Sequence, residues 1–261
     1  MATPGVHPTA VVDGNVELEA GVQIGPHAVL EGPAVIGAET RVGPHAVICR
    51  GVRLGARNAV HAHAVIGDLP QDVSFDGGDT TLEIGDGNVF REGVTLHRST
   101  REGHPTRIGS GCYLMVGAHV AHDCRIGDRV TLTNGVMLGG HVQVGDGAVI
   151  GGGAGVHQFV RIGELAMVAG YTAVRKDVMP CAMLGGDPPR HYRLNAVGLR
   201  RAGVRGAEYR ALEEAFRRLR AGQAMDAPAP GSAVERLSRW LAAESKRGVY
   251  GFARPRGHDG S

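Results

Sequence analysis

The residues of this sequence best suited to chemistry are histidines in the middle of the chain, one of which precedes a carboxylate. A neutral imidazole acts as a general base near pH 7 when a neighbouring group fixes its tautomer. His122 is therefore a candidate base, and the adjacent Asp123 is a candidate to orient it. The other polar residues of this group are His119, His141, His157 and Gln158.

A backbone donor and the absence of a nucleophile motif narrow the reaction type. Gly140, which precedes His141, is suited to present its N–H group to an oxyanion. The sequence contains no Gly-x-Ser-x-Gly motif and no evident cysteine–histidine nucleophile arrangement. This pattern favours direct transfer between two bound substrates over a covalent intermediate.

A metal centre is the main alternative use of these histidines. Three histidine ligands with an open fourth position make a catalytic zinc site. Proteins that resemble γ-class carbonic anhydrases use three histidines, two of them five apart on one strand. The close pair here, His119 and His122, is three apart. The spacing favours a site without metal and leaves a γ-carbonic-anhydrase-like zinc enzyme as the alternative.

The fold that positions these residues is indicated by a six-residue repeat of aliphatic side chains. An aliphatic residue occurs at every sixth position from Val6 to Ile66. The phase returns at Ile84 and, after a second break, runs from Ile108 to Val174. This period is neither the 3.6 residues of a helix nor the alternation of a simple strand. It is the hexapeptide signature of a left-handed parallel β-helix.

The hexapeptide repeat predicts both the shape of the solenoid and its limits. Three six-residue units close a triangular coil of about eighteen residues, and neighbouring coils lie ~4.8 Å apart. The aliphatic side chains point inward, and the 42 glycines and small residues suit the tight corners. We expect an all-β solenoid over residues 1–186, with loops at 67–83 and 97–107 where the period breaks. A small α-helical C-terminal domain is expected over 187–261.

The eighteen-residue coil brings the candidate site residues together. Asp123 and His141 are eighteen apart and should lie directly above one another, and Gln158 should lie two coils above His122. With His157, these residues fall in three adjacent phases and line one edge of the prism. His27 and His45 are also eighteen apart and are expected to stack as turn residues.

The C-terminal part has a helical pattern and a basic charge. Tyr209, Leu212, Phe216 and Leu219 recur at helical spacing, and Ser232 is a candidate N-cap of a further helix. The net charge is +8 from Arg190 to the end and −6 before it, which suggests an acidic partner.

The composition also predicts where in the cell the protein is found. The four cysteines form no close pair and no metal-type spacing, as is typical of reduced cysteines in a cytoplasmic protein. No apolar run approaches the length needed to cross a bilayer, and the first residues have no signal-peptide pattern. We expect a cytoplasmic protein with no membrane span and no nucleic-acid partner.

At these residues the chain resembles the UDP-N-acetylglucosamine O-acyltransferases, the enzymes that begin lipid A synthesis. The likeness covers essentially the full length of the sequence, and its most specific parts are the His-Asp-Cys and His-Gln-Phe segments. The segments that carry it are His7-Pro8-Thr9-Ala10, Pro70-Gln71-Asp72, Ile84-Gly85-Asp86-Gly87-Asn88, Arg91-Glu92-Gly93-Val94-Thr95-Leu96-His97-Arg98, Ala118-His119-Val120-Ala121-His122-Asp123-Cys124, Gly139-Gly140-His141-Val142, Gly155-Val156-His157-Gln158-Phe159 and Asn195-Ala196-Val197-Gly198-Leu199-Arg200-Arg201.

The resemblance implies a reaction and a set of roles. A 3-hydroxyacyl chain would pass from acyl carrier protein to the 3-hydroxyl of UDP-N-acetylglucosamine, with His122 as base, Asp123 as its orienter and Gly140 as oxyanion donor. The acyl group is carried on the phosphopantetheine of the carrier protein, so no separate cofactor is implied. The family works as a homotrimer with sites between chains. The residues implied to contact the nucleotide sugar are Asp72, His119, His141, His157, Gln158, Asn195 and Arg201, and those implied to line the acyl groove are Met167 and Gly170.

The sequence departs from the family pattern at a few positions near the implied nucleotide site. Ser74 stands where lysine is common, Ala202 follows the Arg200-Arg201 pair, and Gly186-Asp187 replaces the usual Gly-Asn. These departures concern contacts to the sugar nucleotide rather than the acid–base chemistry. Transfer to a 3-amino analogue of the sugar, which would give an amide product, stays open as an alternative.

Overall fold

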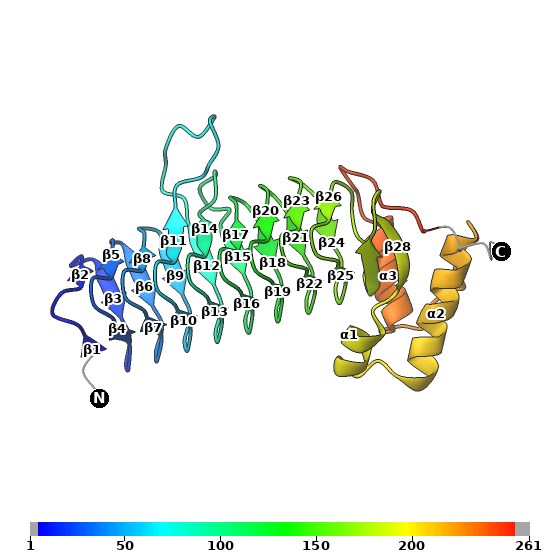
Figure 1. Ribbon diagram of the computed structural model, residues 1–261, viewed down its shortest axis with the longest axis horizontal. Helices are drawn as coiled ribbons and strands as arrows, with labels where there is room; N and C mark the ends of the chain where they lie inside the picture. The colour runs from blue at the N-terminus through cyan, green and yellow to red at the C-terminus, as the bar shows by residue number, and fades with distance from the viewer. Residues whose placement is uncertain (1–4, 254–261) are drawn as a thin grey trace, which may run out of the picture.

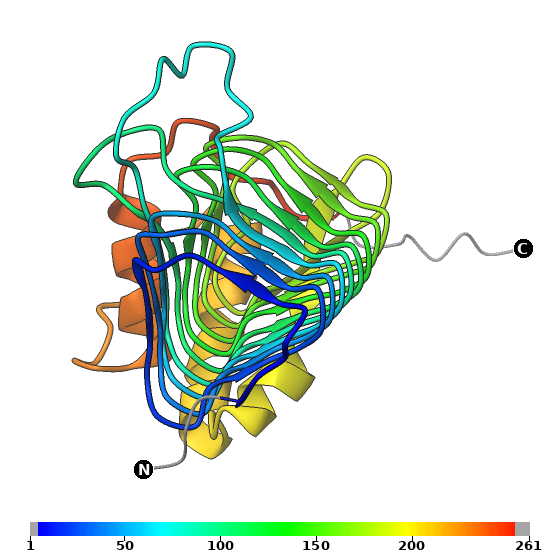
Figure 2. The ribbon, with the colours of Figure 1, turned by 90° about the vertical axis from the view of Figure 1, so that its left-hand side faces the viewer.

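The chain forms a left-handed parallel β-helix followed by a small helical part, which confirms the predicted fold class (Figure 1). The computed structural model describes residues 5–253. Viewed along the solenoid, the coils superpose as a triangle whose three sides are parallel sheets (Figure 2). We name these faces sheet A, sheet B and sheet C, with 11, 9 and 8 strands respectively.

The strands are short, mostly of two or three residues, because each coil must turn three times. Sheet A contains β1 (Gly5–Val6), β4 (Gln23–Ile24), β7 (Arg41–Val42), β10 (Ala59–Val60), β13 (Val89–Phe90), β16 (Tyr113–Leu114), β19 (Thr131–Leu132), β22 (Val149–Ile150), β25 (Met167–Val168), β27 (Ala182–Gly185) and β28 (Arg190–Leu194). Sheet B contains β2 (Val11–Val12), β5 (Val29–Leu30), β8 (Val47–Ile48), β11 (Val65–Asp68), β14 (Thr95–His97), β17 (His119–Val120), β20 (Met137–Leu138), β23 (Gly155–Val156) and β26 (Ala173–Val174). Sheet C contains β3 (Val16–Leu18), β6 (Ala34–Ile36), β9 (Val52–Leu54), β12 (Leu82–Ile84), β15 (Thr106–Ile108), β18 (Arg125–Ile126), β21 (Gln143–Val144) and β24 (Arg161–Ile162).

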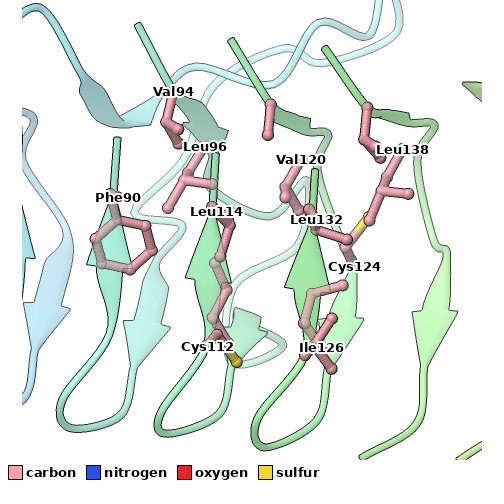
Figure 3. Close-up of a cluster of buried hydrophobic side chains, with 14 of the residues drawn as sticks. Phe90, Val94, Leu96, Cys112, Leu114, Val120, Cys124, Ile126, Leu132 and Leu138 are labelled. Carbon is pink, nitrogen blue, oxygen red and sulfur yellow. The ribbon is translucent and has the colours of Figure 1, made fainter. Parts of the chain in front are cut away.

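The predicted inward positions form the core of the prism. Val120 pairs with Leu138, which pairs with Val156, so side chains eighteen residues apart stack (Figure 3). Every sixth-position residue from Ile24 onward is buried, whereas Val6 at the open N-terminal end is 40% exposed because no coil covers it. This continuous stack fixes the register of every coil, and therefore the height at which each corner residue lies.

Two loops leave the prism where the period breaks. The first connects β11 to β12 across residues 69–81, and the second connects β14 to β15 across residues 98–105. Both start from the corner that joins sheet B to sheet C and project from the same edge of the solenoid (Figures 1 and 2). The strands extend one or two residues into the ranges expected for the loops, because Leu82 and Glu83 still pair with neighbouring coils.

The C-terminal part adds β-structure that the sequence pattern did not predict. β27 continues sheet A, and β28 pairs with it in the antiparallel direction, which closes the open edge of the sheet. The helices follow as α1 (Ala196–Arg201), α2 (Gly206–Arg220) and α3 (Ala233–Ala242). The side chain of Ser232 caps α3 by accepting a hydrogen bond from the Glu235 N–H, as predicted. No helix within residues 5–253 is long and apolar enough to cross a bilayer.

Charged contacts fasten α3 to the last coils. Arg161 forms an ion pair with the fully buried Asp177 at 2.7 Å, and its guanidinium lies 4.4 Å from the centre of the Trp240 ring. Arg236 of α3 reaches Glu164 at 2.6 Å. The helical part is thus held against the solenoid by polar contacts as well as by a second apolar core around Leu212, Phe216 and Leu237.

His191 links the C-terminal segment to the last coil and should make stability depend on pH. It is fully buried, its Nε2 accepts a hydrogen bond from the Met179 N–H, and its Nδ1 lies 2.9 Å from the Tyr250 carbonyl oxygen. Burial lowers the pKa of His191 to about 4. The unfolded chain takes up this proton near pH 6.5, so acid favours the unfolded state between these two values.

We therefore expect the free energy of unfolding to fall by about 2 to 3 kcal/mol between pH 7 and 4.5 through His191 alone. Urea unfolding at both pH values, on the wild type and on His191→Gln, isolates this part because glutamine does not titrate. Equal pH dependence of the two proteins would show that His191 does not carry it.

Candidate active site

The centre of the site is a pair formed by His122 and Asp123 at the corner between β17 and β18. The His122 Nδ1 and the Asp123 Oδ2 lie 2.8 Å apart, and both side chains are 9% exposed. Because a carboxylate only accepts, Nδ1 is the donor in this hydrogen bond, and in the neutral imidazole Nε2 then has the free lone pair. The predicted contact between His122 and Asp123 is therefore present.

The second loop holds the carboxylate of this pair in place. Thr100 donates to Asp123 through its hydroxyl at 2.8 Å and through its N–H at 3.2 Å. Thr106 Oγ1 in turn accepts from the Asp123 N–H at 2.8 Å. Burial would raise the pKa of Asp123, but the hydrogen bonds from His122 and Thr100 outweigh it and hold the pKa below its ordinary value. Asp123 thus stays ionised and able to fix the imidazole.

The next coil places His141 over Asp123, as the eighteen-residue spacing predicted. The His141 Nε2 is 3.7 Å from the Asp123 Oδ2, and its ring meets that of His122 edge-on at a centroid distance of 5.3 Å. Phe159, one coil further on, stacks on His141 at 4.5 Å. Burial lowers the pKa of His141, so this imidazole is neutral near pH 7.

His119 lies on β17, one strand before the pair. Its Nδ1 is 2.8 Å from the Thr95 hydroxyl, and the buried His97 ring contacts it edge-on at 5.2 Å. Burial lowers the pKa of His119, and His97 lowers it further. The arrangement keeps a second neutral imidazole on the strand that precedes His122.

The first loop brings Asp72 to the side of the His122 ring that is not bonded to Asp123. The Asp72 Oδ2 lies 4.0 Å from the His122 Nε2. Both the N–H and the hydroxyl of Ser74 donate to the Asp72 carboxylate, and they lower its pKa. Ser74, where lysine is common, therefore braces Asp72 in this chain.

His157 and Gln158 lie at the same edge two coils above His122 and are contacted by an arginine from the C-terminal segment. Arg247 donates to the Gln158 carbonyl oxygen at 2.8 Å and lies 2.7 Å from the His157 Nδ1. Sequence reasoning missed Arg247 because nothing in its local pattern indicates which coil the segment meets.

Gly140 directly faces the His122 ring. A Cβ atom at this position would lie 2.6 Å from the His122 Cε1 atom, so only glycine fits beside the ring as it stands. Within residues 5–253, no acceptor receives a hydrogen bond from the Gly140 N–H. The amide is therefore available to a bound group.

The remaining predicted residues lie on a different face of the same chain. The Asn195 side chain caps α1 by accepting a hydrogen bond from the Gly198 N–H, and it donates to the Leu165 carbonyl oxygen. Asn195 is only 6% exposed. Asn195, Arg201 and Met167 line a cavity of about 760 Å³ between sheet A and the helices, whereas Gly170 lies at the corner between sheets A and B. Within one chain these four residues are not part of the His122 cluster.

His122, Asp123 and His141 also have the donor atoms of a metal-ligand set. Within residues 5–253, His122, Asp123 and His141 are the one group whose ligand atoms all lie within 4.8 Å of each other. Coordination through the His122 Nδ1 would replace its hydrogen bond to Asp123. Metal binding and the base arrangement described above are therefore competing uses of the same atoms.

Comparison with known proteins identifies the family. Residues 105–140 match the bacterial transferase hexapeptide (six repeats) family, and residues 177–250 match domain 2 of the UDP-N-acetylglucosamine O-acyltransferase family. These matches cover the middle coils and the helical part, respectively.

Relatives named acyl-[acyl-carrier-protein]–UDP-N-acetylglucosamine O-acyltransferase align over most of the chain. The Vibrio atlanticus protein is 48% identical over 226 residues, covering 86% of each chain. The Alkalilimnicola ehrlichii protein is 45% identical over 223 residues, covering 85% of this chain and 86% of the relative. The alignment with the Synechocystis sp. relative is shorter, at 43% identity over 58% of this chain and 55% of that protein.

Solved structures agree in both fold and extent. The UDP-N-acetylglucosamine O-acyltransferase of Moraxella catarrhalis is 36% identical with a TM-score of 0.83, covering 94% of this chain and 99% of that one. The UDP-N-acetylglucosamine acyltransferase of Francisella novicida is 30% identical with a TM-score of 0.87, covering 96% and 95%. On sequence, fold and extent together, the chain belongs to the UDP-N-acetylglucosamine O-acyltransferase family of enzymes.

Proposed function

We propose that this enzyme transfers a 3-hydroxyacyl chain from acyl carrier protein to the 3-hydroxyl of UDP-N-acetylglucosamine, the first step of lipid A biosynthesis. The observation that carries the proposal is the His122–Asp123 pair, in which Nδ1 contacts the carboxylate and Nε2 lies on the opposite side, toward Asp72, in a chain of this family. The names of the relatives supply the donor and acceptor classes.

The proposed chemistry is a direct transfer with one base. The His122 Nε2 takes the proton of the sugar hydroxyl, and the hydroxyl oxygen attacks the thioester carbon. The Gly140 N–H donates to the oxyanion of the tetrahedral intermediate. Collapse breaks the carbon–sulfur bond, and protonated His122 returns its proton to the leaving thiolate. The products are the acylated sugar nucleotide and the free thiol of the carrier protein.

The other residues are proposed to bind the two substrates. Asp72, His119, His141, His157, Gln158, Asn195 and Arg201 would contact the nucleotide sugar, and Met167 and Gly170 would line the acyl groove. No cofactor besides the carrier's phosphopantetheine is required by this chemistry, and a cytoplasmic location stays a prediction.

We further propose a homotrimer in which sheet A of one chain packs on sheet B of the next. The outward positions of sheet C are charged, as at Glu83 and Arg107, whereas sheet B exposes Val11 and Met137 by 62% and 55%. Such a cyclic contact would bury the exposed apolar side chains of sheet B and leave the charged face, sheet C, in water. It also brings Arg201 of one chain toward His122 of its neighbour, which a single chain does not do.

The reaction is tested by mass spectrometry of the product after mixing the protein with UDP-N-acetylglucosamine and a set of 3-hydroxyacyl carrier proteins. An acylated sugar nucleotide with an alkali-labile ester is expected. Product formed only from the 3-amino sugar would instead support amide formation, and no transfer to either acceptor would refute the proposed reaction.

Shared sites between chains are tested by complementation. His122→Ala should lower kcat by about 10²–10⁴-fold, because proton transfer contributes that much. Arg201→Ala should mainly raise the KM for the sugar nucleotide. When the two variants are unfolded and refolded together, random assembly gives one intact site in about four, so about a quarter of the wild-type rate should return at a sugar-nucleotide concentration far below the KM of Arg201→Ala. Mixtures no more active than the separate variants at that concentration would contradict a site shared between chains.

The position of Gly140 is tested by one added methyl group. Gly140→Ala must push the His122 ring aside, and displacement of a base by about 1 Å costs on the order of 100-fold in kcat. Gly152→Ala is the matched control, since its nearest neighbour would lie 3.5 Å from the new Cβ. Unchanged kcat in Gly140→Ala would mean that the ring does not act where it lies.

A further inference from the structure

Three histidines form a column on a corner that the proposed reaction does not use. His27, His45 and His63 occupy the same position in three successive coils, between a strand of sheet A and the next strand of sheet B. Their rings are 5.1 and 5.2 Å apart and nearly parallel, with interplanar angles of 17° and 10°. The stacking expected for His27 and His45 is confirmed, and it extends to His63.

The fold itself does not require imidazoles at this corner. The three histidines have φ values of +57°, +56° and +60°, in the left-handed region that favours glycine. Four later coils place glycine at the same position, at 93, 117, 135 and 153, with φ between +64° and +66°. All three rings are exposed, and within residues 5–253 their ring nitrogens form no hydrogen bond, although the backbone N–H of His27 donates to the Thr9 hydroxyl. The imidazole nitrogens of all three histidines are therefore free to bind a group outside the solenoid.

The corner lies where the proposed trimer has its threefold axis. Sheets A and B are the two faces that pack between chains, so the corner they share points toward the centre. A Cβ at Gly93, Gly117 or Gly135 would have no heavy atom within 4 Å, so the corner is bare there and allows close approach. Tyr171, 91% exposed, lies in the same column and is the kind of side chain that an interface covers.

Symmetry turns each histidine of the column into a set of three. In a cyclic trimer with its axis along the solenoid, the same residue of each chain lies at the same height. His27, His45 and His63 would then form three tiers around the axis, each with three imidazoles. A neutral imidazole nitrogen binds Zn²⁺ at 2.0–2.1 Å, and three such ligands plus water complete a tetrahedral site.

We propose that this column binds divalent transition-metal ions on the threefold axis, one ion per occupied tier, and that each ion joins three chains. Two nitrogens on one ion lie at most about 4.2 Å apart, so parallel rings 5.1 Å apart in one chain do not share an ion. This inference rests on the proposed trimer. The ions would stabilise the N-terminal half of the assembly, away from the coils that carry His122.

The test compares zinc stoichiometry in two variants that differ by a single tier. The double variant His27→Asn/His63→Asn keeps the His45 tier, and the triple variant that adds His45→Asn keeps none. Asparagine tolerates positive φ, so the corner conformation is retained. Equilibrium dialysis against Zn²⁺ at pH 7.5, with metal quantified by mass spectrometry, should show one more ion per three chains in the double variant. Any zinc at His122, Asp123 and His141 is common to both and cancels.

Two further measurements distinguish a failure of the metal-binding proposal from a failure of the proposed trimer or reaction. Light scattering reports the trimer, and product formation reports the reaction, which the triple variant should retain at wild-type kcat. Zinc should raise the melting temperature of the wild type and of the control His104→Asn, an exposed loop histidine, but not that of the triple variant. An intact, active trimer with equal zinc in both variants refutes the column alone. A difference of one ion per chain refutes the shared tier, and an active monomer refutes the assembly and the column together.

Discussion

The stacking of one aliphatic side chain per six residues inside the prism is the constraint on which the rest of the molecule depends. Strand hydrogen bonds fix the spacing of the coils at ~4.8 Å, and three corners fix the coil length. Burying one large aliphatic side chain contributes roughly 1.5–3 kcal/mol, and a one-residue slip would turn a whole coil's inward residues outward. The register is therefore held along the entire solenoid. Asp123 meets His141 as a direct consequence, since they occupy the same corner in successive coils.

The site combines residues of the rigid, stacked coils with residues of two loops that interrupt the repeat. The two loops between β11 and β12 and between β14 and β15 leave from neighbouring coils on the same edge. One supplies Asp72 opposite the His122 Nε2, and the other supplies Thr100 to the Asp123 carboxylate. Interruptions of the period are tolerated here because each loop starts and ends at the same corner, so the coils on either side still pair. The repeat thus fixes the positions of His122, Asp123 and His141, while the loops place Asp72 and Thr100 beside them.

The parts of the structure that follow from periodicity were predictable from the sequence, and those that depend on contacts between distant segments were not. Counting in steps of eighteen along the sequence is enough to place His141 over Asp123 and His27 beside His45, as the structure has them. No such rule relates Thr100 to Asp123, because the loop length breaks the count. Arg247 meets Gln158 from 89 residues away, through a turn of chain whose direction is set by packing of the helices. β28 escaped prediction because its pairing satisfies the free edge of sheet A rather than any pattern of its own.

A single solenoid of this kind is poorly suited to enclose a substrate, and this explains the distribution of the site residues. The interior is filled by stacked aliphatic side chains, so binding surfaces must be assembled outside the prism. The face that carries His122 and the cavity that carries Arg201 and Met167 lie on different sides of one chain. In the proposed reaction, each would supply part of what a transfer between a nucleotide sugar and an acyl chain requires. In the trimer that we propose, the faces of two chains that meet across a symmetry axis would supply the missing enclosure without any change to the repeat. The corner between those faces, where the histidine column lies, would then be the place where all three chains converge.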